Sequence, residues 1–157
     1  GSASGESGLN AVGRQDFASS DEYYDGAPVF VYGYPLFLDA QMLPRLTRAI
    51  TRGGIIAWTD PDGQATRPFL IDAAIFPGNS GGPVFKVPTG LARDGSFDVG
   101  AKVSLLGIAI ETESAPLDKT RSDVRAVGLG SLGIVEPTSR IISLLRDMGA
   151  SFAVPKN

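Results

Sequence analysis

The chain has no sustained helical periodicity before residue 137, and this absence constrains its fold more than any other feature. Short runs of β-branched and aromatic residues instead alternate with glycine, proline and acidic turn signals, a pattern typical of short strands. We predict a turn at Asp60–Gly63, a glycine break at Gly53 and Gly54, and a short helical turn within residues 36–46. The predicted strands cover residues 28–35, 48–58, 67–75, 82–87, 102–112 and 126–135.

One helix is expected, over residues 137–148, where the sequence reads PTSRIISLLRDM. Its apolar residues recur at helical spacing and Gly149 supplies a stop signal, so we expect the apolar stripe to be a packing face. Six closely spaced strands with one terminal helix predict an all-β fold, either an antiparallel barrel or a sandwich. The stripe consists of Ile141, Leu144, Leu145 and Met148.

The 157 residues include no histidine and no cysteine. Histidine is the usual general base for a serine nucleophile and the commonest zinc ligand, so this chain alone cannot build a Ser-His-Asp site, and a zinc hydrolase is nearly as implausible. The absence of cysteine excludes disulfides and a thiol nucleophile. A net charge of −3 without a basic, aromatic stripe argues against nucleic acid, and no apolar run reaches the length of a membrane span.

The segment Phe76–Phe85 reads FPGNSGGPVF and carries the chemistry if Ser80 is a nucleophile. Acyl transfer creates an oxyanion that needs backbone N–H donors about 3 Å away, and Gly78 allows its own amide and that of Ser80 to point to one spot. Gly81 and Gly82 allow the backbone to turn sharply after Ser80. A serine between glycines by itself usually marks only a turn, so the neighbouring segments must decide whether Ser80 is a nucleophile.

Those segments resemble trypsin-like, chymotrypsin-fold serine proteases. GNSGGP is similar to the family signature around the nucleophile, and IDAAIFPGNSGGPV resembles still more the bacterial HtrA (DegP-like) peptidases, which commonly have asparagine before the serine. The run VFVYGYP at 29–35 and GIVEPTSRIISLL at 133–145 also match. The resemblance spans residues 26–148 and implies the second, carboxyl-terminal barrel of that fold: six antiparallel strands in a Greek key, closed by a helix.

The resemblance implies roles for particular residues. Ser80 matches the nucleophile, the amides of Gly78 and Ser80 match the oxyanion hole, and Asn79 helps to set the loop. Ala74 falls near the base of the primary specificity pocket, which implies a preference for uncharged, apolar side chains before the cut. The strand around Leu106–Ile110 would form a wall of that pocket and pair with an extended substrate. The substrate-binding residues expected from it are Gly107, Ile108 and Ala109.

The family's histidine and aspartate lie on the first barrel, upstream of everything matched, and this chain has no counterpart to either. We therefore expect a serine endopeptidase domain that needs no metal or organic cofactor, is inactive as an isolated chain, and acts on a polypeptide. The alternative is a pseudoprotease barrel that serves as a binding or scaffolding module. A third possibility is a site assembled from two polypeptides.

The organisation expected from the sequence is a flexible segment over residues 1–25, followed by the barrel and helix over residues 26–157. Residues 1–8, GSASGESG, resemble a cloning scar or a flexible linker, and no signal peptide is recognised. The face that would meet the first barrel is apolar, so we expect that barrel, or a second copy of the chain, to cover it.

Overall fold

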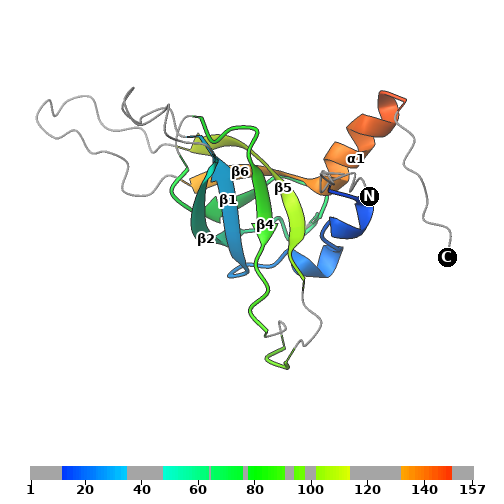
Figure 1. Cartoon of the computed structure of the whole chain (residues 1–157). Coiled ribbons are helices and arrows are strands. Elements are labelled where there is room, and N and C mark those ends of the chain that lie inside the picture. The colour runs from blue at the N-terminus through cyan, green and yellow to red at the C-terminus, as the bar shows by residue number, and fades with distance from the viewer. Residues whose placement is uncertain are drawn as a thin grey trace, which may run out of the picture.

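The protein folds into a closed β-barrel with one helix at its carboxyl-terminal end (Figure 1). The computed structural model describes residues 12–34, 48–63, 65–75, 78–90, 94–97, 102–113 and 132–149. The expected cloning scar and the helical turn expected within residues 36–46 lie outside these ranges. The strands are β1 (Pro28–Gly33), β2 (Ile50–Trp58), β3 (Phe69–Asp72), β4 (Pro83–Lys86), β5 (Ser104–Glu113) and β6 (Leu132–Pro137).

All neighbouring strands pair antiparallel, in the order β1-β2-β3-β6-β5-β4, and the pairing of β4 with β1 closes the barrel. Chain neighbours pair within β1-β2-β3 and within β4-β5-β6, while β1–β4 and β3–β6 join the two groups. The predicted all-β, six-stranded antiparallel barrel with a terminal helix is confirmed. Closure excludes the sandwich, because no edge remains between two separate sheets.

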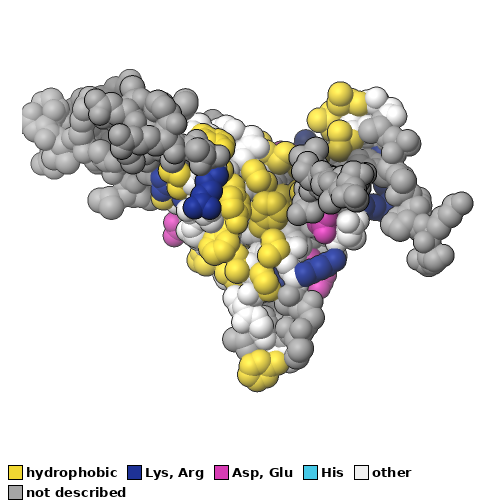
Figure 2. All heavy atoms as spheres, in the orientation of Figure 1, with side chains coloured by type: hydrophobic (Ala, Val, Ile, Leu, Met, Phe, Trp, Pro, Cys, Tyr) yellow, Lys and Arg dark blue, Asp and Glu magenta, His cyan; other side chains and the backbone are white. Residues whose placement is uncertain are grey.

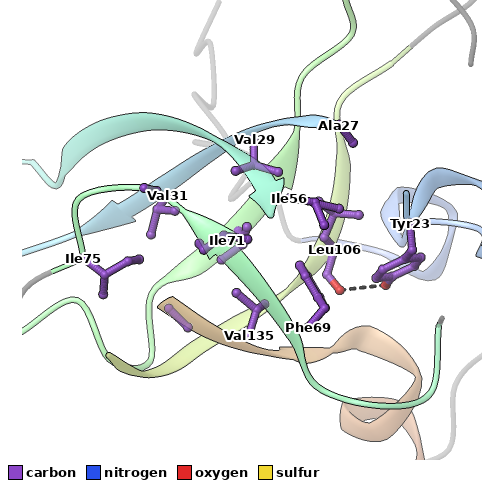
Figure 3. Packing of buried hydrophobic residues seen from close by; sticks show 13 residues of the cluster. Tyr23, Ala27, Val29, Val31, Ile56, Phe69, Ile71, Ile75, Leu106 and Val135 are labelled. Carbon is purple, nitrogen blue, oxygen red and sulfur yellow. Dashed lines mark hydrogen bonds between the residues drawn. The ribbon is translucent and has the colours of Figure 1, made fainter. Parts of the chain in front are cut away.

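The barrel interior is filled by side chains that alternate with outward-facing residues along β1, β3 and β6, whereas four consecutive residues of β5, Ser104–Gly107, are all buried. Val29 and Val31 point inward from β1 while Phe30 between them is exposed. Figure 3 shows how the inward side chains from different strands meet. The buried cluster contains Tyr23, Ala27, Val29, Val31, Ile56, Phe69, Ile71, Ala73, Ile75, Val84, Leu106, Ala109 and Val135.

Strand β2 runs without the break predicted at its two glycines, so that prediction was wrong. A Cβ atom at Gly54 would lie 2.6 Å from the Cβ of Ala73 and would overlap the Asp72 carbonyl oxygen, so this glycine permits close approach rather than ending the strand. The irregularity comes later, as a shift of register between Ile56 and Trp58. A turn follows as predicted, with the Gly63 amide donating to the Asp60 carbonyl at 3.1 Å.

The helix α1 (Thr138–Asp147) matches the predicted range closely, but its apolar stripe is only partly a packing face. Ile141 and Leu145 are half-buried, whereas Leu144 is 60% and Met148 is 74% exposed. The expectation was therefore wrong for the two exposed residues, because the helix lies against the end of the barrel instead of being enclosed by it. In the described part of the chain, no helix is long and apolar enough to cross a membrane.

Residues 12–27 pack along the barrel, although a flexible segment was expected through residue 25. Two short 3-10 helices, η1 (Arg14–Asp16) and η2 (Ser20–Glu22), lead to Tyr23, which is 1% exposed. The Tyr23 hydroxyl donates to the Leu106 carbonyl at 2.7 Å (Figure 3). It also lies 2.9 Å from Thr138 Oγ1. This one side chain thus joins the amino-terminal segment, β5 and α1.

We expect Tyr23→Phe to lower the free energy of unfolding by about 1–3 kcal/mol, because the Leu106 carbonyl and the Thr138 hydroxyl lose a buried partner. Burial raises the pKa of Tyr23 above its ordinary value. Its contribution to stability is therefore complete below the unfolded pKa of about 10 and is lost as the pH rises further, so the variant should also show a shallower alkaline loss.

Urea denaturation at several pH values measures both effects. Tyr34→Phe serves as the control, because Tyr34 is 48% exposed. Equal stabilities of the Tyr23→Phe and Tyr34→Phe variants across the pH range would contradict the assigned role of Tyr23.

Candidate active site

Ser80 lies on the loop that leads from β3 into β4, three residues before β4 begins, and it is exposed. Residues 76 and 77 of the FPGNSGGPVF segment lie outside the described ranges. Gly78 and Gly81 adopt φ angles of 97° and 84°, in the left-handed region that favours glycine. The two glycines therefore allow the backbone to turn on both sides of the serine, as the sequence predicted.

Backbone hydrogen bonds fasten the far end of this loop to β5. The Gly81 amide donates to the Ala109 carbonyl at 2.7 Å, and the Ala109 amide donates to the Gly82 carbonyl at 2.9 Å. Within the loop, the Gly82 amide donates to the Asn79 carbonyl at 2.9 Å. The residues directly after Ser80 are thus part of the barrel's hydrogen-bond network.

The loop also packs tightly against the end of β1, and glycine is needed on both sides of that contact. A Cβ atom at Gly82 would overlap the Tyr32 carbonyl oxygen and lie 2.8 Å from the Asn79 carbonyl oxygen. A Cβ atom at Gly33 would lie 3.0 Å from the Asn79 Cα atom. Backbone therefore rests directly on backbone, which fixes the position of Ser80 relative to β1.

Asn79 is fully buried beneath this contact, at 0% exposure. Neither its side-chain nitrogen nor its side-chain oxygen has a hydrogen-bond partner among the residues that the structure describes. An unsatisfied buried polar group costs about 1–3 kcal/mol, so the residue before the serine is held in an unfavourable environment. Such exceptions are rare in folded proteins and frequently mark functional sites.

A cavity of about 540 Å³ opens beside Ser80, on the side of β1 and β4. Its walls combine aromatic side chains with glycine backbone, and the rings of Tyr32 and Phe85 meet edge to face at 5.7 Å between centroids. The volume lies in the range of sites that bind small molecules or side chains. The lining residues are Tyr32, Gly33, Tyr34, Ala49, Gly78, Ser80, Gly81, Gly82, Pro83 and Phe85.

The amides of Gly78 and Ser80 donate no hydrogen bond to any residue that the structure describes. Both residues border the cavity, so two backbone donors and one hydroxyl are available next to the same space. This arrangement has the parts that acyl transfer needs at the attacked carbonyl, namely a nucleophile and donors for the oxyanion. The general base is the missing part, because the chain contains no histidine.

The other residues expected to bind substrate lie at different distances from this loop. Ala109 is bonded to it directly, and Ile108 pairs with Pro83 at the start of β4. Gly107 pairs with Val84 and is wedged against the backbone of β6, where a Cβ atom would overlap the Glu136 carbonyl oxygen. Ala74 is exposed and stands two residues after the end of β3.

Sequence analysis missed the residues of β1 that line the cavity. Tyr32, Gly33 and Tyr34 precede Ser80 by more than 40 positions, and they reach it only because β1 pairs with β4. The alternation of aromatic residues in VFVYGYP was a usable signal, since it places Phe30, Tyr32 and Tyr34 on one face of a strand.

The family model for the trypsin-like peptidase domain matches residues 6–91, more than half of the 157-residue chain. The chain belongs to this family. The match includes the first four strands and the Ser80 loop. This trypsin-like peptidase domain is thus of the serine-protease type, a hydrolase class that acts on polypeptides. No significant relative was found among curated protein sequences.

We expect Asn79→Leu to leave the free energy of unfolding of this trypsin-like peptidase domain unchanged, or to raise it by up to about 2 kcal/mol. Leucine has the same branching as asparagine, with methyl groups in place of its polar atoms, and removing a buried amide that has no partner among the described residues removes its desolvation penalty. Chemical denaturation of both proteins tests this, with Asn79→Ala as the variant that leaves a cavity. A loss above about 1 kcal/mol for Asn79→Leu would show that the amide is hydrogen-bonded in solution.

Proposed function

We propose that the protein is a serine endopeptidase domain in which Ser80 attacks the scissile carbonyl and the amides of Gly78 and Ser80 bind the oxyanion. The observation that carries the proposal is the exposed Ser80 beside two amides that donate to no described residue. In the reaction the Ser80 oxygen bonds to the carbonyl carbon, its proton passes to a base, and the amine leaves with that proton.

The base in this proposal is a histidine from outside these 157 residues, and the isolated chain is inactive. The cavity beside Ser80 supports this route, because it is wide enough to admit a side chain next to the hydroxyl. The base is carried either by a first barrel, as the family resemblance implies, or by another polypeptide. The site needs no metal ion or organic cofactor, since the nucleophile, the base and the oxyanion donors complete the chemistry.

The substrate in this proposal extends along β5. After Ala109, residues 111–113 pair with β6 and with no other described strand, so in the described part of the chain nothing pairs with their other edge. An extended peptide can add to such an edge by backbone hydrogen bonds. Gly107, Ile108 and Ala109 then hold this edge against β4, and Ala74 is assigned to the base of the primary specificity pocket.

Asn79 supports a place near the bacterial HtrA (DegP-like) peptidases, which commonly have asparagine before the serine. The neutral side chain of asparagine needs no buried cation as a partner at this position, whereas the charged side chain of a buried aspartate would need one. This closer assignment rests on the motif IDAAIFPGNSGGPV alone.

The outer face of β1 and β4 supports the proposal that a partner covers this side of the barrel. Figure 2 shows hydrophobic side chains gathered over these strands. Phe30 is 39% and Tyr34 is 48% exposed, and Phe30 pairs with Phe85 across the strands. A first barrel or a second copy of the chain would remove this apolar surface from water.

A binding module without activity is the second candidate, and the absence of histidine favours it. It predicts that Ser80 reacts like any exposed serine. The two candidates therefore differ in the intrinsic reactivity of Ser80 when a base is supplied.

We expect free imidazole to restore the first chemical step. Imidazole can enter the cavity and accept the proton while Ser80 attacks p-nitrophenyl acetate, which releases p-nitrophenolate and leaves an acetyl group on Ser80. Peptide mapping by mass spectrometry should find Ser80 acetylated at least about tenfold faster than Ser96, a modest part of the 10²–10³ that one oxyanion donor contributes.

Ser96 is the matched control, because it is exposed and lies in a turn, where its hydroxyl donates to Asp94 at 2.6 Å. Ser80→Ala shows how much acetylation falls on other residues. Equal rates at Ser80 and Ser96 would favour the binding module and sink the endopeptidase proposal.

We also expect the isolated chain to self-associate through the β1–β4 face, and Phe30→Glu to abolish this by placing a charge in its centre. Analytical ultracentrifugation over a concentration series measures the effect. Leu144→Glu is the control, since Leu144 is 60% exposed but lies on α1. A wild-type chain that stays monomeric, or equal effects of the two variants, would refute the assignment of this face.

A further inference from the structure

The amino-terminal segment holds β5 at the position where the pairing of β5 with β4 is irregular. We propose that Glu22 and Tyr23 are positioning residues, which fix the register of β5 on β4 and thereby place the Ser80 loop. Only the last step of this inference rests on the proposed function. The register of the two strands is a property of the barrel, whereas its consequence concerns the nucleophile.

The irregularity is one extra residue in β5. Val84 pairs with Gly107, but the next residue of β4, Phe85, pairs with Leu105. Leu106 therefore has no partner on β4, which makes it the extra residue of a β-bulge. A neighbouring residue could be the unpaired one instead, so the register of β5 depends on contacts that single out Leu106.

Tyr23 supplies one such contact. Its hydroxyl donates to the Leu106 carbonyl at 2.7 Å, so the bulge residue has a partner in the amino-terminal segment (Figure 3). The Ala18 amide donates to the Leu105 carbonyl at 2.9 Å, and Phe17 forms a parallel bridge with Leu105. The amino-terminal segment thus binds both the bulge residue and the residue before it.

Glu22 holds the pair of residues on the side of the bulge away from Ser80. Its Oε1 atom accepts a hydrogen bond from Ser104 Oγ at 2.5 Å and lies 3.5 Å from Lys86 Nζ. Lys86 on β4 and Ser104 on β5 are register partners, so one carboxylate links the two strands. The other oxygen of Glu22 accepts from the Ser19 amide at 2.9 Å, which fixes the carboxylate in place.

The burial of β5 agrees with this arrangement. Figure 1 shows the amino-terminal segment beside β5. The four residues Ser104–Gly107 are buried consecutively, although a strand with one face in water alternates. Leu106 belongs to the interior cluster. Leu105 lies outside that cluster and is 9% exposed, because the amino-terminal segment covers it at Phe17 and Ala18.

The other end of the same pair of strands holds the Ser80 loop. Ala109, three residues beyond the bulge, accepts from the Gly81 amide at 2.7 Å and donates to the Gly82 carbonyl at 2.9 Å. If the bulge moved toward Ala109, Ile108 would face Gly82 in its place, since a slip of one residue changes every pair that it passes. The position of Ser80 therefore depends on where the bulge is held.

Hydrogen exchange measured by NMR tests the register without using the chemistry of Ser80. We expect Tyr23→Phe and Glu22→Gln each to speed exchange of the Gly81 and Ala109 amides at least about fivefold relative to the amides of the β2–β3 ladder, because each variant removes hydrogen bonds that hold β5. Glu22→Gln keeps the shape of the side chain but replaces one of its acceptor oxygens by an NH₂ group and removes its charge.

Cross-strand proton contacts report the register directly. In the wild-type chain Val84 should show contacts with Gly107, its register partner. In the double variant Tyr23→Phe, Glu22→Gln, a second set of contacts from Val84 to Leu106 should appear. If the loss of the Tyr23 hydroxyl prevents folding, Glu22→Gln alone gives the test, since the Glu22 side chain is 20% exposed and its replacement is milder.

Asp60→Asn is the matched control. It also removes a carboxylate that pairs with a cation, Arg67 at 2.6 Å, but this pair lies in the turn after β2. Asp60→Asn should leave the exchange ratio and the register contacts unchanged. The consequence for the nucleophile is measured by acetylation with p-nitrophenyl acetate and imidazole, in which Ser80 should lose most of its advantage over Ser96 in both strap variants, Tyr23→Phe and Glu22→Gln, and keep it in the control.

The outcomes separate this inference from the function on which its last step rests. An unchanged exchange ratio in both strap variants, or the same change in Asp60→Asn, would overturn the role of Glu22 and Tyr23. A changed register that leaves Ser80 as reactive as before would overturn the link from β5 to the nucleophile. Equal reactivity of Ser80 and Ser96 in the wild-type chain contradicts the proposed function instead, and the exchange ratio then still decides whether the amino-terminal segment holds β5.

Discussion

The pairing of β4 with β1 is the constraint on which the rest of the structure depends. It closes the barrel, and it also brings Tyr32, Gly33 and Tyr34 to a loop that follows them by more than 40 residues. Because β4 begins three residues after Ser80 and pairs with β5 on its other side, the loop is held at its carboxyl-terminal end by two strands. Ser80 is exposed, yet it is fixed by the same contacts that close the fold.

The loop around Ser80 is hydrogen-bonded to the barrel on one side and borders the cavity on the other. Toward the barrel, Gly81, Gly82 and Ala109 exchange backbone hydrogen bonds, and the glycines let backbone rest on backbone. On the open side lie the exposed Ser80 and a cavity, while the buried Asn79 amide below the loop has no hydrogen-bond partner in the described part of the chain. The open side also has no histidine, since the chain contains none.

The sequence was sufficient for features that depend on local chemistry. Glycine and proline signals with β-branched runs placed all six strands, and the periodicity of residues 137–148 placed α1. Predictions from the sequence failed where tertiary contacts determine the local structure. Gly54 looked like a break but allows close approach to Ala73, and Tyr23 stood in a polar stretch yet is buried by bonds to β5 and α1. The cavity walls could not be assigned, since no local pattern states which strand pairs with β4.

The segment from Ile71 to Val84 shows why stability and chemistry are coupled here. Ile71, Ile75, Asn79 and Val84 are all buried, so the backbone that carries Ser80 returns to the interior both before and after it. A loop anchored in this way loses its conformational entropy during folding. Little further conformational entropy is then lost when a substrate binds. The placement of Ser80 and the packing of the barrel interior therefore depend on the same buried residues.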